Sequence, residues 1–127
     1  MNKILVTGGA GFIGSNFVHH VLRRYPDLTL VNLDALTYAG NLGNLTGLEE
    51  NPDHTFVHGS VVDSDLLGEL FREHRFDAAV NFAAETHVDR SLQDTRPFLD
   101  TNLVGTQNLL DASRAGGVGR FVQISTD

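Results

Sequence analysis

The feature that most constrains the fold is a glycine-rich turn close to the N-terminus. Glycines spaced as Gly8-x-x-Gly11-x-x-Gly14 lie between an apolar, β-rich run over Lys3–Thr7 and a segment over Phe12–Arg24 with apolar residues at helical spacing. Gly8 permits a tight turn, Gly11 lets a ligand approach the backbone without meeting a Cβ, and Gly14 allows close helix-to-strand packing. The order of strand, turn and helix predicts the start of a βαβ unit.

Strand-like and helix-like segments alternate along the rest of the chain. Tyr25-Pro26-Asp27 ends the first helix, and further strands are predicted over Leu28–Leu33, ending at Asp34, and over Thr55–His58, Asp77–Phe82 and Phe121–Ile124. Helices are predicted around Leu42–Leu48, over Asp65–His74, and from near Pro97 to about Ala115, where Gly116-Gly117 follow. This pattern predicts one α/β domain over residues 1–127, a Rossmann-type doubly wound parallel sheet with strand order 3-2-1-4-5.

Composition narrows the classes of ligand and compartment. The chain has 127 residues, 41% of them hydrophobic, and a formal net charge of -7, which disfavours a nucleic-acid partner. An anionic ligand must therefore be held locally, by backbone amides or a few arginines. The absence of cysteine excludes disulfides and thiolate chemistry and is compatible with a reducing cytoplasm. The run Ile4-Leu5-Val6 is too short for a membrane span, so we expect a cytoplasmic protein without a membrane partner.

Asp34 indicates which kind of ligand the glycine turn binds. It follows the second strand, 20 residues after Gly14, where a carboxylate accepts hydrogen bonds from ribose hydroxyls. The turn and Asp34 together predict a dinucleotide site, with the pyrophosphate on free amides at the start of the helix. Asp34 would repel a 2'-phosphate, and no arginine lies between Arg24 and Arg72, so NAD is favoured over NADP. The alternative is that Asp34 only caps the next turn.

Two further segments follow strands at the carboxyl edge, where open α/β sheets bind ligands. After strand four, Ala83 and Ala84 are small enough to pass close to a flat cofactor. The alternating Glu85, His87 and Asp89 could ligate a metal, but no second cluster supports them, and we predict no metal site. After strand five, Ser125-Thr126-Asp127 would lie beside the nicotinamide; the alternative is an ordinary strand-end cap.

Taken together, these residues resemble the extended short-chain dehydrogenase/reductase family, and within it the dTDP-glucose 4,6-dehydratases. The first of the motifs that carry the resemblance marks only the superfamily, whereas the second, third and last together are specific to the dehydratases. The motifs are Gly8-Gly9-Ala10-Gly11-Phe12-Ile13-Gly14-Ser15, Leu36-Thr37-Tyr38-Ala39-Gly40-Asn41-Leu42, the run from Ala84 to Ser91, Thr101-Asn102-x-x-Gly105-Thr106 and Ile124-Ser125-Thr126-Asp127.

The resemblance implies a redox cycle on a nucleotide sugar, dTDP-glucose. Hydride would leave sugar C4 for NAD, water would be lost across C5 and C6, and hydride would return to C6. Asp127 matches the acid that protonates the departing hydroxyl, Thr126 a contact near sugar O4, and Thr86 a position next to both cofactor and sugar. A homodimer is implied for the full-length enzyme. The implied NAD site is lined by Phe12, Ile13, Asp34, Ala35, Leu36, Thr37, Gly40, Ser60, Val61, Phe82, Ala83, Ala84, Thr86, Thr101 and Ser125.

Three departures from the family pattern qualify this expectation. Ala35 replaces a common lysine, and Ser60 replaces an aspartate that contacts the adenine amino group. The family's Tyr-x-x-x-Lys pair is missing, because Lys3 is the sole lysine. We therefore expect the N-terminal, cofactor-binding part of a longer enzyme, inactive alone. The competing hypotheses are a nucleotide-sugar 4-epimerase or decarboxylase on the same scaffold and a non-catalytic NAD-binding module.

Overall fold

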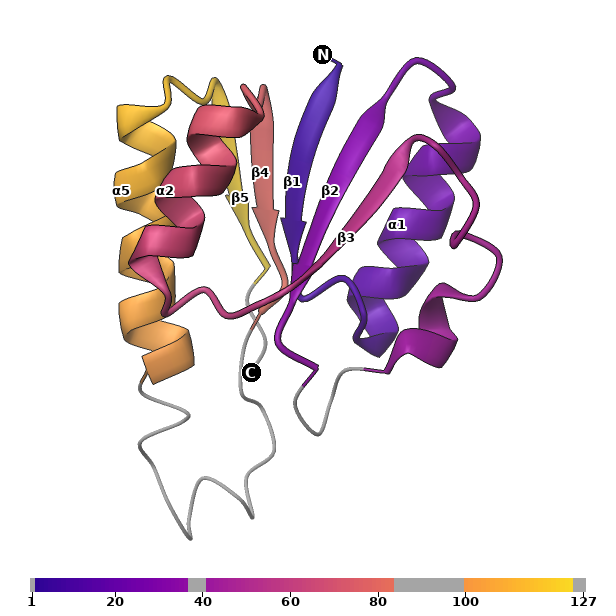
Figure 1. The fold of residues 1–127 in the computed structure, drawn as a ribbon, viewed down its shortest axis with the longest axis horizontal. Helices are drawn as coiled ribbons and strands as arrows, with labels where there is room; N and C mark the ends of the chain where they lie inside the picture. The colour runs from indigo at the N-terminus through magenta and orange to yellow at the C-terminus, as the bar shows by residue number, and fades with distance from the viewer. Residues whose placement is uncertain (1, 37–40, 84–99, 125–127) are drawn as a thin grey trace, which may run out of the picture.

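A computed structural model describes residues 2–36, 41–83 and 100–124, with Asp100 and Thr101 described by their backbone alone. Five parallel strands form one sheet in the order β3-β2-β1-β4-β5, which confirms the predicted order (Figure 1). Each strand begins and ends within one residue of its predicted position. The strands are β1 (Lys3–Thr7), β2 (Thr29–Asp34), β3 (His54–His58), β4 (Ala78–Asn81) and β5 (Arg120–Gln123).

The central strand β1 is apolar because it is covered on both faces of the sheet. Leu5 lies in register with Val31 of β2 and Ala79 of β4, and Leu5 and Val6 are fully buried. Side chains alternate between faces, so Ile4 and Val6 enter one core and Leu5 the other. The near-continuous apolar strands therefore reflect a parallel sheet between two helical layers.

The helices cover the two faces unequally (Figure 1). Helix α1 (Phe12–Arg24) packs on one face, together with the short 3₁₀ helix η1 (Leu42–Leu45). On the opposite face lie α2 (Ser64–Glu73) and α5 (Thr106–Ala115), which is preceded by the π-helical turn η2 (Asp100–Gly105). Switching faces between β3 and β4 leaves the glycine turn where the strand order reverses, the place at which such sheets bind ligands.

Local sequence signals explain where the helices begin and end. Asp63 caps α2 by accepting a hydrogen bond from the Leu66 amide (3.0 Å). After α5, Gly117 has a φ of +69°, and the amide of Val118 donates to the Ser113 carbonyl (2.9 Å), which forms a Schellman ending. The helix predicted over Leu42–Leu48 is shorter, because the backbone leaves the helical region at Thr46 (ψ 133°). The predicted start near Pro97 lies outside the described residues.

Part of the sheet has no helix over it among the described residues. A groove of about 920 Å³ lies on the α1 side of the sheet, and its lining includes Ala78 and Val80 of β4 and Val122 of β5. Arg24 and Arg120 also line it. It shares no residue with the glycine turn. Within the described ranges, we find no helix with the length and apolar character that a membrane span requires.

Candidate functional site

The glycine turn lies at the carboxyl end of β1, packed against the chain that leaves β4. Gly8 has a φ of +77°, a conformation that L residues with a side chain rarely adopt. A Cβ at this position would lie 2.6 Å from the Phe82 carbonyl carbon and 2.6 Å from the Ala83 nitrogen. Gly8 therefore serves two needs at once, since it supplies the turn conformation and lets two backbone segments touch.

Two other glycines of the turn are required for space. A Cβ on Gly14 would collide with the Gly8 carbonyl oxygen, so Gly14 lets α1 pack closely against the turn that follows β1. A Cβ on Gly9 would collide with the side chain of Asn32, a residue of β2 that is fully buried. The motif spacing did not identify Gly9, because its neighbour is 23 positions away and Gly9 falls between the motif glycines.

Helix α1 begins with unpaired amides next to this turn. Gly11 is its N-cap, and no side chain caps the helix there. The amides of the first turn have no acceptor within the helix and carry the positive end of its dipole. The side chains of Phe12 and Ile13 are 76% and 57% exposed beside them. Gly11 has an ordinary φ of -75°, so its predicted need for a missing side chain, rather than for flexibility, stays a prediction.

Asp34 is only 8% exposed, and both of its carboxylate oxygens accept backbone hydrogen bonds. Oδ2 accepts from the Ala10 amide (2.8 Å) and Oδ1 from the Leu36 amide (2.7 Å). Asp34 thus forms the turn cap that was the alternative hypothesis. Each oxygen keeps a second lone pair, so the ribose contact is compatible with this cap and stays a prediction. Leu36, with a φ of 56°, is held in a strained left-handed conformation beside it.

The loop after β3 carries two residues of the predicted NAD site, Ser60 at the adenine end and Val61. The Ser60 hydroxyl accepts from the Val62 amide (3.2 Å) and keeps its own hydrogen for a further acceptor. Val61 is 3% exposed, and its carbonyl accepts from Asn108 Nδ2 of α5 (3.1 Å). On the neighbouring strand end, the Ala35 carbonyl is 3.1 Å from His58 Nε2.

A buried asparagine ties the ends of three strands together. Asn81 of β4 is fully buried; its Oδ1 accepts from the Thr7 hydroxyl of β1 and from the Ala83 amide (2.9 Å). Its Nδ2 donates to Gln123 Oε1 of β5 (2.9 Å). Phe82 packs its ring against Phe17 of α1, with centroids 5.3 Å apart. No motif or spacing in the sequence marks Asn81, which directs the chain from β4 past the glycine turn.

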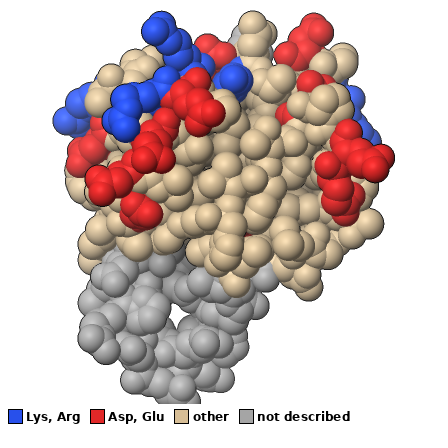
Figure 2. Space-filling model, viewed as in Figure 1, with Lys and Arg blue, Asp and Glu red and all other residues tan. Residues whose placement is uncertain are grey.

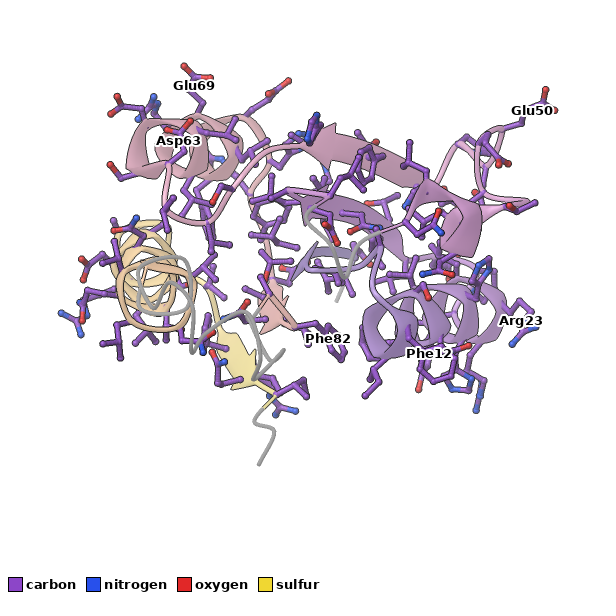
Figure 3. All side chains as sticks on the ribbon, turned by 90° about the horizontal axis from the view of Figure 1, so that it is seen from below. Phe12, Arg23, Glu50, Asp63, Glu69 and Phe82 are labelled. Atoms are coloured by element: carbon purple, nitrogen blue, oxygen red, sulfur yellow. The ribbon has the colours of Figure 1, made fainter. Side chains whose placement is uncertain are left out.

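Figure 3 looks onto this edge of the sheet and shows Phe82 between the sheet and α1, with Phe12 on the helix. In Figure 2, the charged side chains gather over the upper part of the visible face, away from the carboxyl ends of the strands. The remaining predicted site residues fall outside the description. They are Thr37, Gly40, Ala84, Thr86, Ser125, Thr126 and Asp127, the side chain of Thr101, and the weighed metal ligands Glu85, His87 and Asp89.

Behind the turn, His54 faces the buried Asn32 at 3.3 Å between Nε2 and Nδ2. Burial lowers the pKa of His54 below its usual 6.5, and the neighbouring His19 lowers it further. The lowered pKa favours the neutral form of His54, in which Nε2 can accept from the Asn32 amide.

Comparison with known proteins decides the family. The family model described as GDP-mannose 4,6 dehydratase matches residues 5–127. The chain belongs to this dehydratase family. It is 53% identical over 124 residues to a low-salt glycan biosynthesis protein of Haloferax volcanii, covering 98% of this chain and 39% of that protein. It is 51% identical over 132 residues to a dTDP-glucose 4,6-dehydratase of Xanthomonas campestris, covering 97% of this chain and 37% of that one.

A solved dehydratase structure shows the same fold. The crystal structure of a dTDP-glucose 4,6-dehydratase double mutant from Streptomyces venezuelae, with NAD bound, superposes with a TM-score of 0.88 at 49% identity. It matches 97% of this chain and 39% of that one. The resemblance drawn from the motifs is confirmed, and the chain spans somewhat under two fifths of the length of these dehydratases.

Proposed function

We propose that this chain is the cofactor-binding part of an NAD-dependent enzyme that dehydrates a nucleotide sugar, converting dTDP-glucose to dTDP-4-keto-6-deoxyglucose. The observation that carries the proposal is the cradle at the carboxyl edge, where Gly8, Gly9 and Gly14 leave no room for a Cβ and α1 begins uncapped. In a member of this dehydratase family, such a cradle fits the pyrophosphate of a dinucleotide.

The residues around the cradle fit the rest of NAD. Asp34 would accept from the adenosine ribose and oppose a 2'-phosphate, so we propose NAD rather than NADP. Its burial supports this selectivity, because a carboxylate fixed by two amides cannot turn away from an incoming phosphate. The Ser60 oxygen accepts one hydrogen bond, from the Val62 amide, and its second lone pair could accept from the adenine amino group. When bound, NAD would supply the hydride acceptor and donor of the internal redox cycle.

At the reacting end, the assignments come from the motifs. We propose that Asp127 protonates the leaving C6 hydroxyl, that Thr126 hydrogen-bonds near sugar O4, and that Thr86 lies between cofactor and sugar. The supporting observation is that β5 runs parallel to β4 and ends at Gln123, so the chain after it emerges at the same sheet edge as the glycine turn. These residues would therefore meet a sugar placed beside the nicotinamide.

We also propose that the natural full-length protein forms a homodimer. On the surface of η2 and α5, Leu103 is 63% exposed, Val104 46% and Leu110 39%. Exposed apolar side chains grouped along one helical segment are typical of a subunit interface. Substituting Leu103 and Leu110 with glutamate should convert the dimer to a monomer in size-exclusion chromatography with light scattering. An unchanged mass would place any dimer contact elsewhere.

The activity is tested in the natural full-length protein with dTDP-glucose and NAD. We expect a 4-keto-6-deoxy product, recognised by its alkaline ultraviolet absorbance and by mass spectrometry as the loss of one water. Asp127→Asn should still oxidise C4, so NADH absorbance builds up, while water loss slows by roughly 100- to 10,000-fold. Release of a 4-epimer without water loss would show an epimerase, and NAD binding without any conversion of the sugar would show a binding module.

A further inference from the structure

The second position inside the glycine turn, Ala10, is fully buried, and both of its backbone polar groups are bonded. Its amide donates to Asp34, as described above. Its carbonyl accepts two hydrogen bonds, from the Asn41 amide (3.0 Å) and from Asn44 Nδ2 (2.8 Å). Asn44 lies in η1, 34 positions further along the chain. Two donors fill the capacity of a carbonyl oxygen, so this peptide group is fixed from the η1 side.

Asn44 is itself held in place by α1. Its backbone carbonyl accepts from His19 Nε2 (2.9 Å), and the next residue, Leu45, is 4% exposed in the core that also contains Val18 of α1. The contacts are therefore connected: the turn is bonded to η1, η1 is bonded to α1, and α1 continues directly from the turn. A donor fixed in this way can orient the group that it binds.

We propose that Asn44 is a positioning residue for the dinucleotide turn, an inference that depends on the proposed NAD site. The Ala10 carbonyl and the Gly11 amide belong to one rigid peptide plane. Holding that carbonyl sets the direction in which the chain enters α1 at its N-cap, Gly11, and so aims the first free amides of the helix at the pyrophosphate. Asn41 donates through its backbone, which any residue but proline supplies, so side-chain identity matters at Asn44.

The competing explanation is that Asn44 only stabilises η1. A positioning role predicts a selective loss of binding, because the α1 amides that this peptide plane orients would meet the pyrophosphate and not the nucleoside. In the natural full-length protein, Asn44→Ala should raise the Kd of NAD and of ADP by about 5- to 10-fold, the effect of one hydrogen bond. The Kd of adenosine should change by less than about 2-fold. Asn44→Asp, which keeps the shape but lacks the N–H, should lose at least as much.

Thr46→Ala is the matched control, because Thr46 donates to the Gly43 carbonyl (2.8 Å) beside η1 without touching the turn. It should bind NAD, ADP and adenosine as the wild type does, by titration calorimetry and by competition for adenosine. If Asn44→Ala does not fold, His19→Phe replaces it, since this variant removes the donor to the Asn44 carbonyl and keeps a ring; its NAD and ADP affinities should fall together.

The outcomes separate the inference from the function on which it depends. Selective loss of NAD and ADP binding in the Asn44 variants, with a normal Thr46 variant, supports the positioning role. Equal loss for adenosine, or NAD binding as tight as in the wild type, overturns it while leaving the proposed function intact. A wild-type protein that binds neither NAD nor ADP overturns the proposed function, and the role of Asn44 with it.

Discussion

Gly8 allows a quantitative test of how the glycine turn is built. Substituting Gly8 with alanine has two costs: the left-handed backbone, at φ +77°, and the collision of the new methyl group with backbone atoms 2.6 Å away. Gly117 allows the two costs to be measured separately. It shares the left-handed backbone, with a φ of +69°, but no atom lies within 4 Å of the position that a Cβ would take. Gly117→Ala therefore measures the conformational cost alone.

The structure sets the expected magnitudes. The left-handed conformation costs an alanine about 1–2 kcal/mol, and about 0.4–1 kcal/mol is recovered because alanine also restricts the unfolded chain. Gly117→Ala should thus lower the free energy of unfolding by about 1 kcal/mol. Overpacking adds about 1–3 kcal/mol, and Gly8→Ala belongs at the upper end because its neighbours, in Phe82 and Ala83, are backbone atoms that cannot rotate away.

Urea unfolding of the two variants in the natural full-length protein, followed by circular dichroism without NAD, measures the difference directly. Omitting NAD matters, because a ligand that binds only the folded state would add its own stabilisation. We expect Gly8→Ala to unfold at a clearly lower urea concentration than Gly117→Ala. The free energy of unfolding of Gly8→Ala should be lower by about 2–3 kcal/mol. Equal losses in the two variants would refute the argument that the turn is packed directly against the segment leaving β4.

Three further predictions follow from individual contacts. Ser113→Ala should raise the free energy of unfolding by about 1 kcal/mol, because the buried hydroxyl has no partner among the described residues; unchanged or lower stability would show that it is bonded. Gly9→Ala should be strongly destabilising alone and less so with Asn32→Ala, and a urea double-mutant cycle without coupling would contradict the collision between these positions. Because the folded pKa of His54 lies below its unfolded value of 6.5, the stability it contributes is present above pH 6.5 and lost as the pH falls through the folded pKa. His54→Gln should flatten that fall in urea midpoints, and an unchanged pH profile would contradict it.

The sequence predicts the elements well because their signals are local. The helical spacing from Phe12 and the stop at Pro26 correctly predict the bounds of α1, and the apolar runs predict each strand within one residue. The loop between β2 and β3 is less predictable: a short helix is expected around Leu42–Leu48, but only Leu42–Leu45 are helical, and turns follow, with Gly47 at a φ of +94°. Leu45 and Leu48 are both buried, so packing of these apolar side chains holds the segment in place without a longer helix.

A site residue can be predicted from the sequence only where its residue type, at its spacing from other residues, has a single structural explanation. Gly8 and Gly14 meet that condition, and so does the placement of Asp34 at the end of β2. The contacts that hold the turn do not, because they join residues without any periodic relation, such as Ala10 with Asn44. A histidine in α1 and an asparagine in a polar loop are individually unremarkable residues, and only the fold places His19 and Asn44 within hydrogen-bond distance.

Asp34 shows why a correct residue assignment does not settle a role. Spacing alone suggested a ribose contact or a turn cap as alternatives, yet the same carboxylate can do both. Its two bonds to the amides of Ala10 and Leu36 fix it in position, and they leave each carboxylate oxygen a second lone pair. Asp34→Ala would therefore loosen the glycine turn as well as remove a ribose acceptor, and weaker NAD binding would not distinguish the two. Cofactor preference does distinguish them: a ribose contact predicts that NADP gains relative to NAD in this variant, whereas a turn cap alone predicts equal losses for both.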